Sequence, residues 1–545
     1  MKKLVSLLAV STLLLAACGT TSQGKSSSSN DSQAVKQEIA VSTPGELSTL
    51  DSAQYTDVNS SDMIGQVTEG LYRLDKNGDP ELAMAKEKPK ISEDGLTYTF
   101  KIRNAQYSDG TPVKAGDFVY AFQTVVDPAT ASSASSRMDI FKNASKIRSG
   151  KLPVDQLGVE AKDDQTLVLY LENPAPFLPE ILTGTPFMPK QQAFAQEKGK
   201  AYGTSAENFV GNGPFILKDW NGNNESWTLE KNPKYWDKEN VRLEKINVQV
   251  VKEIATGVNL FNDGQLDYTL LSDVYAQNNQ DNPLAHFAPK ATVGYISVNQ
   301  KRPVTGNVHV RQAILQAINK ASFTKNILAD GSKPLNGFVP ANFAKNPKTG
   351  EDYRKEAGKF MSYDLKAAQK AWETAKKELG QDKIHLELLA SDTAVSKKTV
   401  EFLQGQLQQN LPGLTIDIKN VPLQNRLDLQ TAGDFDLVYG TWTPDYADPI
   451  NFLEFYESTG GLNSSGYVNK DYDAGLVEAR TTLANNPAKR WQKLIDLEET
   501  LIEKDTAVLP FYQGSVAYLQ SKRLKDLQVF PFGRTVSYRL AYVSK

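Results

Sequence analysis

Apolar and polar residues alternate in several short segments of the first 300 residues, a pattern typical of half-buried strands. In the segment LTYTFKIR, residues 96–103, every second residue is apolar. Similar segments predict further strands at residues 166–171, 227–231 and 245–251. Proline-rich stretches such as ENPAPFLPE separate them and predict loops. This part of the chain is therefore expected to be mixed and rich in strands.

The pattern changes to a helical period near residue 308, where VHVRQAILQAINK places apolar residues on one face. A second helix is predicted between Asp364, a candidate N-cap, and Gly380, a candidate C-terminal stop. Strands are predicted directly after it at residues 384–390 and, after another helix, at 414–421. Such alternation predicts an α/β lobe. Two lobes would form a cleft, and clefts between domains are where ligands bind.

The first residues have the pattern of an export signal. Two lysines at positions 2 and 3 precede an apolar run at residues 4–15, which is too short to span a bilayer. The sequence LAAC, residues 15–18, resembles a bacterial lipobox, and Cys18 is the one cysteine of the chain. The resemblance implies a signal peptide at residues 1–17 and a lipid on Cys18. An ordinary secretory signal with an incidental cysteine is the alternative.

Residues 18–37 are rich in Ser and Gly, so they predict a flexible tether. The remaining chain, residues 38–545, is too long for one hydrophobic core, and two or three domains are expected. The formal net charge of −3 gives no reason to expect a nucleic acid or an anionic lipid as a partner.

Motifs of catalysis and of metal binding are absent from the sequence. The three histidines, His286, His309 and His385, do not form pairs at metal-ligand spacing. There is no HExxH, CxxC, GxSxG or P-loop motif. We therefore predict no catalytic residue, no metal and no cofactor, and we do not expect an enzyme.

The segment TWTPDYADPINFL, residues 441–453, places Asp445 and Asp448 among aromatic residues and prolines. A carboxylate in such surroundings is costly to bury unless a positive group meets it. Asp448 precedes Pro449 and has the form of a helix N-cap with proline at the first helical position. For Asp445 a loop turn is the structural alternative to a binding role.

A second segment, YSDGTPVKAGDFVY at residues 107–120, resembles the signature of the extracellular solute-binding proteins that feed oligopeptide ABC transporters. Several further segments match that family in the same order: STLDS, TEGLYRLDKNGDPE, GPFILKDW, KNPKYWD, INVQVV, YISVNQKRPV with VRQAI, and DFDLVYGTWTPDYADP. The resemblance implies an α/β, two-lobed fold of the periplasmic-binding-protein kind, which closes on its ligand like a flytrap, with an additional inserted small domain. The implied parts are a first lobe (residues 38–70, 205–300 and 513–545), the small domain (71–204) and a second lobe (301–512).

The resemblance also implies a site. In oligopeptide-binding relatives, the acid of a W-x-x-D-Y segment accepts the α-amino group of the peptide, and here that acid is Asp445. Its cation is therefore expected to arrive with the ligand. The peptide main chain is held as an added strand in this family. The strand around Thr441 to Thr443 and the loop at residues 55–58, with Thr56, Asp57 and Val58, would supply the backbone groups for it.

Three aromatic residues of the same segment, Trp442, Tyr446 and Tyr439, are candidates for contacts with peptide side chains, with core packing as the alternative for each. Relatives often have a basic residue for the peptide C-terminus where this chain has Tyr439. How the carboxylate of a peptide is held therefore stays open, and longer peptides that protrude at that end would be consistent.

The function implied is a monomeric oligopeptide receptor, held by a lipid on the extracellular face of a Gram-positive cell membrane. Its partners would be oligopeptides and the permease subunits of an ABC importer. A receptor for one peptide pheromone on the same fold is the alternative. A surface peptidase or chaperone is less favoured, and the scarcity of histidine disfavours binding of nickel or haem.

Overall fold

The computed structural model describes residues 35–545. The predicted signal peptide, Cys18 and most of the predicted tether lie outside the described residues. Within residues 35–545, no helix combines the length and the apolar composition that a membrane span needs. The described residues from Gln37 onward group into one unit.

A mixed sheet of eleven strands joins β1, from the start of the described chain, to strands from its C-terminal half. In spatial order its strands are β15 (Leu414–Val421), β14 (Ile384–Ser391), β16 (Leu437–Trp442), β12 (Ala285–Val298), β17 (Val508–Gln520), β11 (Tyr268–Leu271), β1 (Glu38–Thr43), β10 (Lys245–Val250), β9 (Ser226–Lys231) and β8 (Phe215–Lys218), while β13 (Lys333–Pro334) pairs with β17. The strands that the sequence predicted at 227–231, 245–251, 384–390 and 414–421 are confirmed within one or two residues at each end.

The long strands β12 and β17 connect the two halves of this sheet. The first part of β12 pairs with residues 515–519 of β17, and β17 in turn pairs with β11. The second part of β12, from Val293 onward, pairs with β16. The register of the β12–β17 pair shifts between Pro289 and Val293, and such an irregularity bends a strand. The two halves of the sheet therefore meet at a bend.

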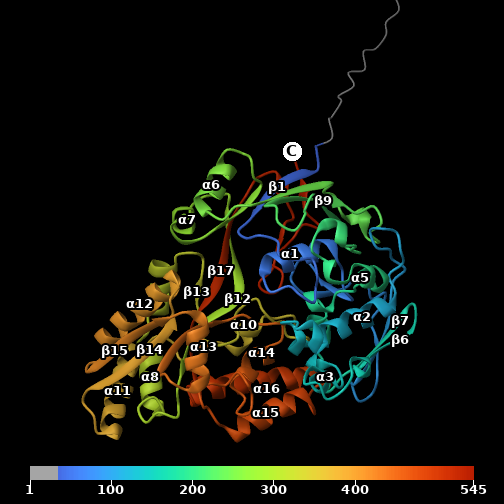
Figure 1. Cartoon of the computed structure of the whole chain (residues 1–545). Coiled ribbons are helices and arrows are strands. Elements are labelled where there is room, and N and C mark those ends of the chain that lie inside the picture. Colours follow the sequence, from blue (N-terminus) through green and yellow to red (C-terminus); the bar gives the residue numbers. More distant parts are fainter. Residues whose placement is uncertain (1–34) are drawn as a thin grey trace, which may run out of the picture. The chain divides into compact units, whose positions relative to one another are not determined.

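The C-terminal half of the sheet is covered by helices whose boundaries follow local sequence signals. In α11 (Leu365–Leu379), the Asp364 side chain accepts a hydrogen bond from the backbone of Ala367, and Gly380 with φ of 64° ends the helix. Helices α8 (Val308–Ala317), α12 (Ala394–Asn410) and α13 (Leu423–Ala432) belong to the same half. Figure 1 shows these helices around β14 and β15. Parallel pairing of β14 with β15 confirms the α/β character predicted for this part.

A smaller four-stranded sheet, in the order β4-β5-β7-β6, has an apolar core of its own, and we call this part the small body. Its strands are β4 (Lys90–Ile91), β5 (Thr97–Lys101), β6 (Val159–Asp163) and β7 (Thr166–Tyr170). The helix α2 (Ala115–Val126) and the 3₁₀-helix η2 (Ser135–Ile140) belong to the same body. The core of this body runs from Ala53 to Val210 and is distinct from the core of the C-terminal half.

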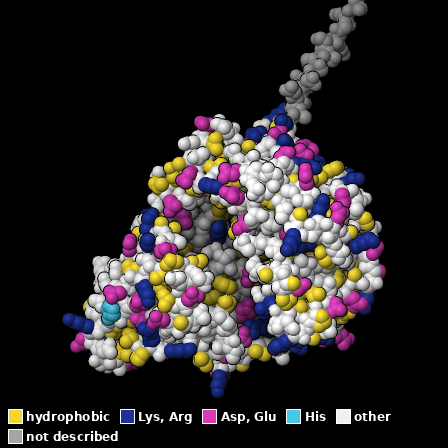
Figure 2. All heavy atoms as spheres, in the orientation of Figure 1, with side chains coloured by type: hydrophobic (Ala, Val, Ile, Leu, Met, Phe, Trp, Pro, Cys, Tyr) yellow, Lys and Arg dark blue, Asp and Glu magenta, His cyan; other side chains and the backbone are white. Residues whose placement is uncertain are grey.

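The surface is hollowed where the parts of the described chain meet. Figure 2 shows this hollow in front of β12 and β17, with side chains of several kinds around its rim. The residues predicted for ligand binding come from β16 and the turn after it, and from the loop before α1 (Val58–Val67) and its first residue.

Candidate functional site

Asp445 follows β16 by three residues, and its side chain is 40% exposed. Its backbone N–H donates to Oδ1 of Asn451, which fixes the turn. The sequence led us to expect that its cation would come from a ligand, but the protein supplies one: Nη2 of Arg137 lies 2.6 Å from Oδ1 of Asp445. Arg137 is 308 positions away in the sequence and belongs to no motif, so sequence reasoning missed it.

Arg137 also connects Asp445 to the loop before α1. Its Nη1 donates to the hydroxyl of Tyr55 over 3.0 Å. The same loop is tied to the residues before η2, because Ser133 donates to the Tyr55 carbonyl and Gln54 donates to the carbonyl of Thr130. Burial raises the pKa of the Tyr55 phenol. The loop before α1 and the residues around η2 are therefore both linked through Arg137 to the Asp445 carboxylate, although all three segments are distant in sequence.

Thr441 on β16 and Thr443, the first residue after it, are exposed. The hydroxyls of Thr443 and Thr292 lie 2.7 Å apart, which links the end of β16 to β12. On its other side β16 pairs with β14 at Leu437 and Val438 only. From Tyr439 onward, this edge of β16 has no strand neighbour in the part of the chain that the structure describes.

The aromatic residues of β16 differ in accessibility. Trp442 is half-buried and packs edge-on against Phe455, and its indole N–H has no hydrogen-bond partner among residues 35–545. Tyr439 is only 4% exposed, and its hydroxyl lies 2.9 Å from that of Tyr512. In this conformation Tyr439 belongs to the core, while Trp442 lies between the core and the open edge.

Tyr446 joins the C-terminal half to the small four-stranded body. Its ring stacks on Phe177 at 4.9 Å between centroids with an interplanar angle of 9°. Its hydroxyl donates to Oε1 of Glu454, which also pairs with Arg480. Burial raises the pKa of the Tyr446 phenol, with Glu454 adding to the rise. Adjacent residues 445 and 446 therefore both contact the small body.

In the loop before α1, Asp57 has a local partner. It is the N-cap of α1, and its side chain accepts hydrogen bonds from the backbone N–H of Ser60 and the hydroxyl of Ser48. Its neighbours Thr56 and Val58 are exposed. Asp57 therefore holds the loop in place, while Thr56 and Val58 on either side of it are exposed to solvent.

Asp448 makes the capping contact that the sequence predicted, and it has a second partner that the sequence did not indicate. Pro449, directly before α14 (Ile450–Leu453), already has helical backbone angles, with φ of −54° and ψ of −28°. Asp448 accepts a hydrogen bond from the backbone N–H of Ile450, and it forms a buried two-pronged ion pair with Arg490 at 2.7 and 2.9 Å. Its partner lies 42 residues away, which a local capping pattern could not indicate.

A cavity of about 440 Å³ adjoins Asp445 on the side of the small body. Apolar side chains such as Ile140, Ile181 and Phe187 line it together with Arg137 and Glu172. A ligand that reached Asp445 could therefore place its first side chain in this cavity. Among residues 35–545 no cluster of His, Cys, Asp and Glu suits a metal ion.

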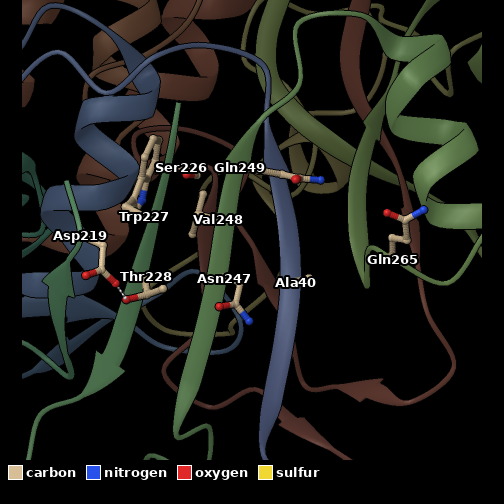
Figure 3. A pocket seen from close by; sticks show the side chains of 9 residues that line it. All are labelled: Ala40, Asp219, Ser226, Trp227, Thr228, Asn247, Val248, Gln249 and Gln265. Carbon is tan, nitrogen blue, oxygen red and sulfur yellow. Dashed lines mark hydrogen bonds between the residues drawn. The ribbon is translucent and has the colours of Figure 1, made fainter. Parts of the chain in front are cut away.

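A separate pocket lies on the β1-β10-β9 part of the large sheet and contains none of the predicted site residues (Figure 3). Several of its polar side chains form hydrogen bonds within the protein. Thr228 donates to Asp219 over 3.0 Å, and Asn247 donates to Glu38. Among the residues that line this pocket, only Asp219 is charged and could bind a peptide terminus.

Comparison with known proteins identifies the family. Residues 79–464 match the model of bacterial extracellular solute-binding proteins, family 5. The chain belongs to this family. A dipeptide-binding protein of Lactococcus lactis subsp. cremoris is 35% identical over 99% of this chain and 98% of its own length. The structure of Listeria monocytogenes OppA bound to peptide is 42% identical, with a TM-score of 0.73 over 94% of this chain and 100% of that one. The pheromone receptor PrgZ is 38% identical, with a TM-score of 0.74 and the same coverages.

These matches confirm the family and the fold class that the sequence predicted. Family 5 proteins are binding receptors rather than enzymes, which agrees with the absence of catalytic motifs from the sequence.

Proposed function

We propose that this family 5 protein is a lipid-anchored extracellular receptor that binds oligopeptides and delivers them, as a monomer, to the permease subunits of an ABC importer. The observation that carries the proposal is the Asp445 carboxylate, 40% exposed and placed directly beyond the unpaired edge of β16. The names of the relatives, which describe dipeptide, oligopeptide and pheromone binding, support it. The LAAC sequence at residues 15–18 supports the lipid anchor.

In this proposal the peptide's α-ammonium replaces Arg137 at Asp445. The peptide main chain continues as an added strand along β16 near Thr441 and Thr443, since that edge has no neighbour. Exposed Thr56 and Val58 would face the peptide from the loop before α1. Residues 38–70, 205–300 and 513–545 would act as one lobe and residues 301–512 as the other, closing around the bend in β12 and β17.

The deciding experiment compares wild type with Asp445→Asn, using peptides with a free and with an acetylated N-terminus. Closure would bury the ammonium–carboxylate pair, and losing one member of a buried pair costs about 3–5 kcal/mol. Affinity for the free peptide should therefore fall by roughly two to four orders of magnitude. Acetylation should weaken wild type similarly and change little in the variant, since both changes remove one interaction.

Asp434→Asn is the matched control, because Asp434 is exposed and paired with Arg302. It should leave peptide affinity unchanged. Equal binding of free and acetylated peptides by wild type would show that Asp445 is not the amine anchor.

The similarity to PrgZ favours a second candidate, a receptor for one signalling peptide. Mass spectrometry of peptides that co-purify with protein lacking residues 1–18 separates the two. Many unrelated sequences indicate general uptake, and one sequence indicates signalling.

A further inference from the structure

Arg426, on α13, is a partly buried arginine without an acidic partner among residues 35–545. Its Nη1 donates to Oε1 of Gln430 over 2.9 Å, and its Nε is buried without a hydrogen-bond partner in the described part of the chain. Burial lowers the pKa of its guanidinium, and the groups that oppose this shift are the phenols of Tyr295 and Tyr439 rather than a carboxylate. A cationic donor left unsatisfied in this way is costly to the folded protein.

Three more deeply buried arginines, Arg354, Arg490 and Arg311, have acceptors for their donors. Arg354 pairs with Glu498 at 2.7 Å, and Arg490 pairs with Asp448. Arg311 has no acid within ion-pair distance but donates to four backbone carbonyls. Arg426 differs from these arginines, because its one acceptor is a neutral amide.

The guanidinium of Arg426 reaches β16 at Gly440. A Cβ atom on Gly440 would lie 3.4 Å from Nη1 of Arg426 and 3.5 Å from the hydroxyl of Tyr295. Burial raises the pKa of the Tyr295 phenol to about 12, so its hydroxyl keeps its proton and can donate. A cation and a hydroxyl donor therefore lie close together beside one point of the strand that carries no side chain.

We propose that Arg426, assisted by the Tyr295 hydroxyl, binds the C-terminal carboxylate of a peptide whose α-ammonium is held by Asp445; this rests on the proposed function. A carboxylate accepts paired N–H donors from a guanidinium, and such charge-assisted hydrogen bonds are the stronger ones. Tyr439, which stands where relatives often have a basic residue, is buried against Tyr512. The cation for the carboxylate comes from α13 instead.

The two anchors also set a length. Gly440, on β16, and Asp445, in the turn after it, are five positions apart and therefore lie at most about 17 Å from each other. An extended peptide spans about 3.3–3.6 Å per residue. Peptides of about four or five residues are therefore long enough to reach both anchors at once.

Calorimetry with alanine peptides of about three to seven residues, each as the free acid and as the C-terminal amide, tests the inference. Charge-assisted hydrogen bonds contribute about 1.5–3 kcal/mol, so amidation should weaken wild-type binding of the four- and five-residue peptides roughly tenfold to a hundredfold. Arg426→Met should bind acid and amide alike, at the affinity of the amide. Arg426→Lys should restore part of the difference, and Tyr295→Phe should lower it severalfold.

Arg302→Met is the matched control, because Arg302 is paired with Asp434 and Asp436 in the same half of the protein. It should keep the full difference between acid and amide. Arg426→Met should also unfold at the wild-type temperature or above, since the removed cation has no acidic partner. An equal affinity of wild type for acids and amides, or an unchanged ratio in Arg426→Met, would overturn the inference while the amine dependence of binding still supports the proposed function. Failure of every peptide to bind would overturn both.

Discussion

Nη2 of Arg137 lies 2.6 Å from Oδ1 of Asp445, although the two residues are 308 positions apart in the sequence. Both side chains are 40% exposed. Water therefore reaches the pair, and its two members can separate at small cost. The carboxylate that we propose as the amine anchor already holds a cation of the protein, and a peptide ammonium has to compete with it.

Arg137→Met should therefore strengthen the binding of peptides with a free N-terminus. Exposed ion pairs contribute about 0.2–1 kcal/mol, so the dissociation constant should fall roughly twofold to fivefold. Peptides with an acetylated N-terminus should bind the variant and wild type alike. Arg148→Met is the control, since Arg148 forms an ion pair of equal length with Asp139 on the same body. A loss of affinity in Arg137→Met would show that Arg137 contacts the peptide itself.

Asp448→Asn should destabilise the protein far more than a lost helix cap would. Arg490 and Asp448 are both nearly buried, and removal of one partner leaves the other charge unpaired. The free energy of unfolding should fall by about 3–5 kcal/mol. Replacing both residues, as Asp448→Leu with Arg490→Met, should cost less than the single change. Chemical denaturation measures this, with Asp434→Asn as the exposed comparison, expected to cost at most about 1 kcal/mol.

The sequence predicted elements whose signals are local. Helix α11 begins after Asp364 and ends at Gly380 because the cap and the left-handed glycine act within one turn. Strand β5 follows from alternation alone. The position of Asp445 beyond β16 could also be predicted, since strand and acid are neighbours in the chain.

The partners of the site residues could not be predicted, because they depend on packing between distant segments. Arg137 reaches Asp445 from the small body, and Arg490 reaches Asp448 from another helix. Arg426 lies only 14 positions before Gly440. The pattern of apolar and polar residues nevertheless does not indicate that the Arg426 side chain lies close to this strand, or that it has no acidic partner among the described residues.

Cys18→Ala should release the protein from the cell surface. The prediction rests on the LAAC sequence, because this residue lies outside the described part of the chain. Two acyl chains attach a protein stably, and without the thiol neither chain can be added at this position. Fractionation of cells measures the outcome, with Ser22→Ala as a control in the same segment. A variant that remains with the membranes as wild type does would contradict the lipid anchor.

Glu180 should make stability depend on pH near neutrality. Its Oε2 is buried without a partner among the described residues, and burial raises the pKa of the carboxyl from 4.5 to about 7. Nearby Asp448 and Asp79 raise it further, while Arg490 opposes them. Between pH 4.5 and 7 the folded protein therefore keeps a proton that the unfolded chain releases. Stability from this group is present below pH 4.5 and is lost as the pH rises towards 7.

Glu180→Gln removes this dependence, since the amide stays neutral at every pH. Relative to wild type, the variant should gain up to about 3 kcal/mol in the free energy of unfolding when the pH is raised from about 5 to about 8. Thermal unfolding at both pH values measures the change. Glu172→Gln, an exposed carboxyl on the same body, should show no such change. If Glu180→Gln and wild type differ by the same amount at both pH values, the Glu180 carboxyl is ionised throughout this range, and its neighbours stabilise the charge despite its burial.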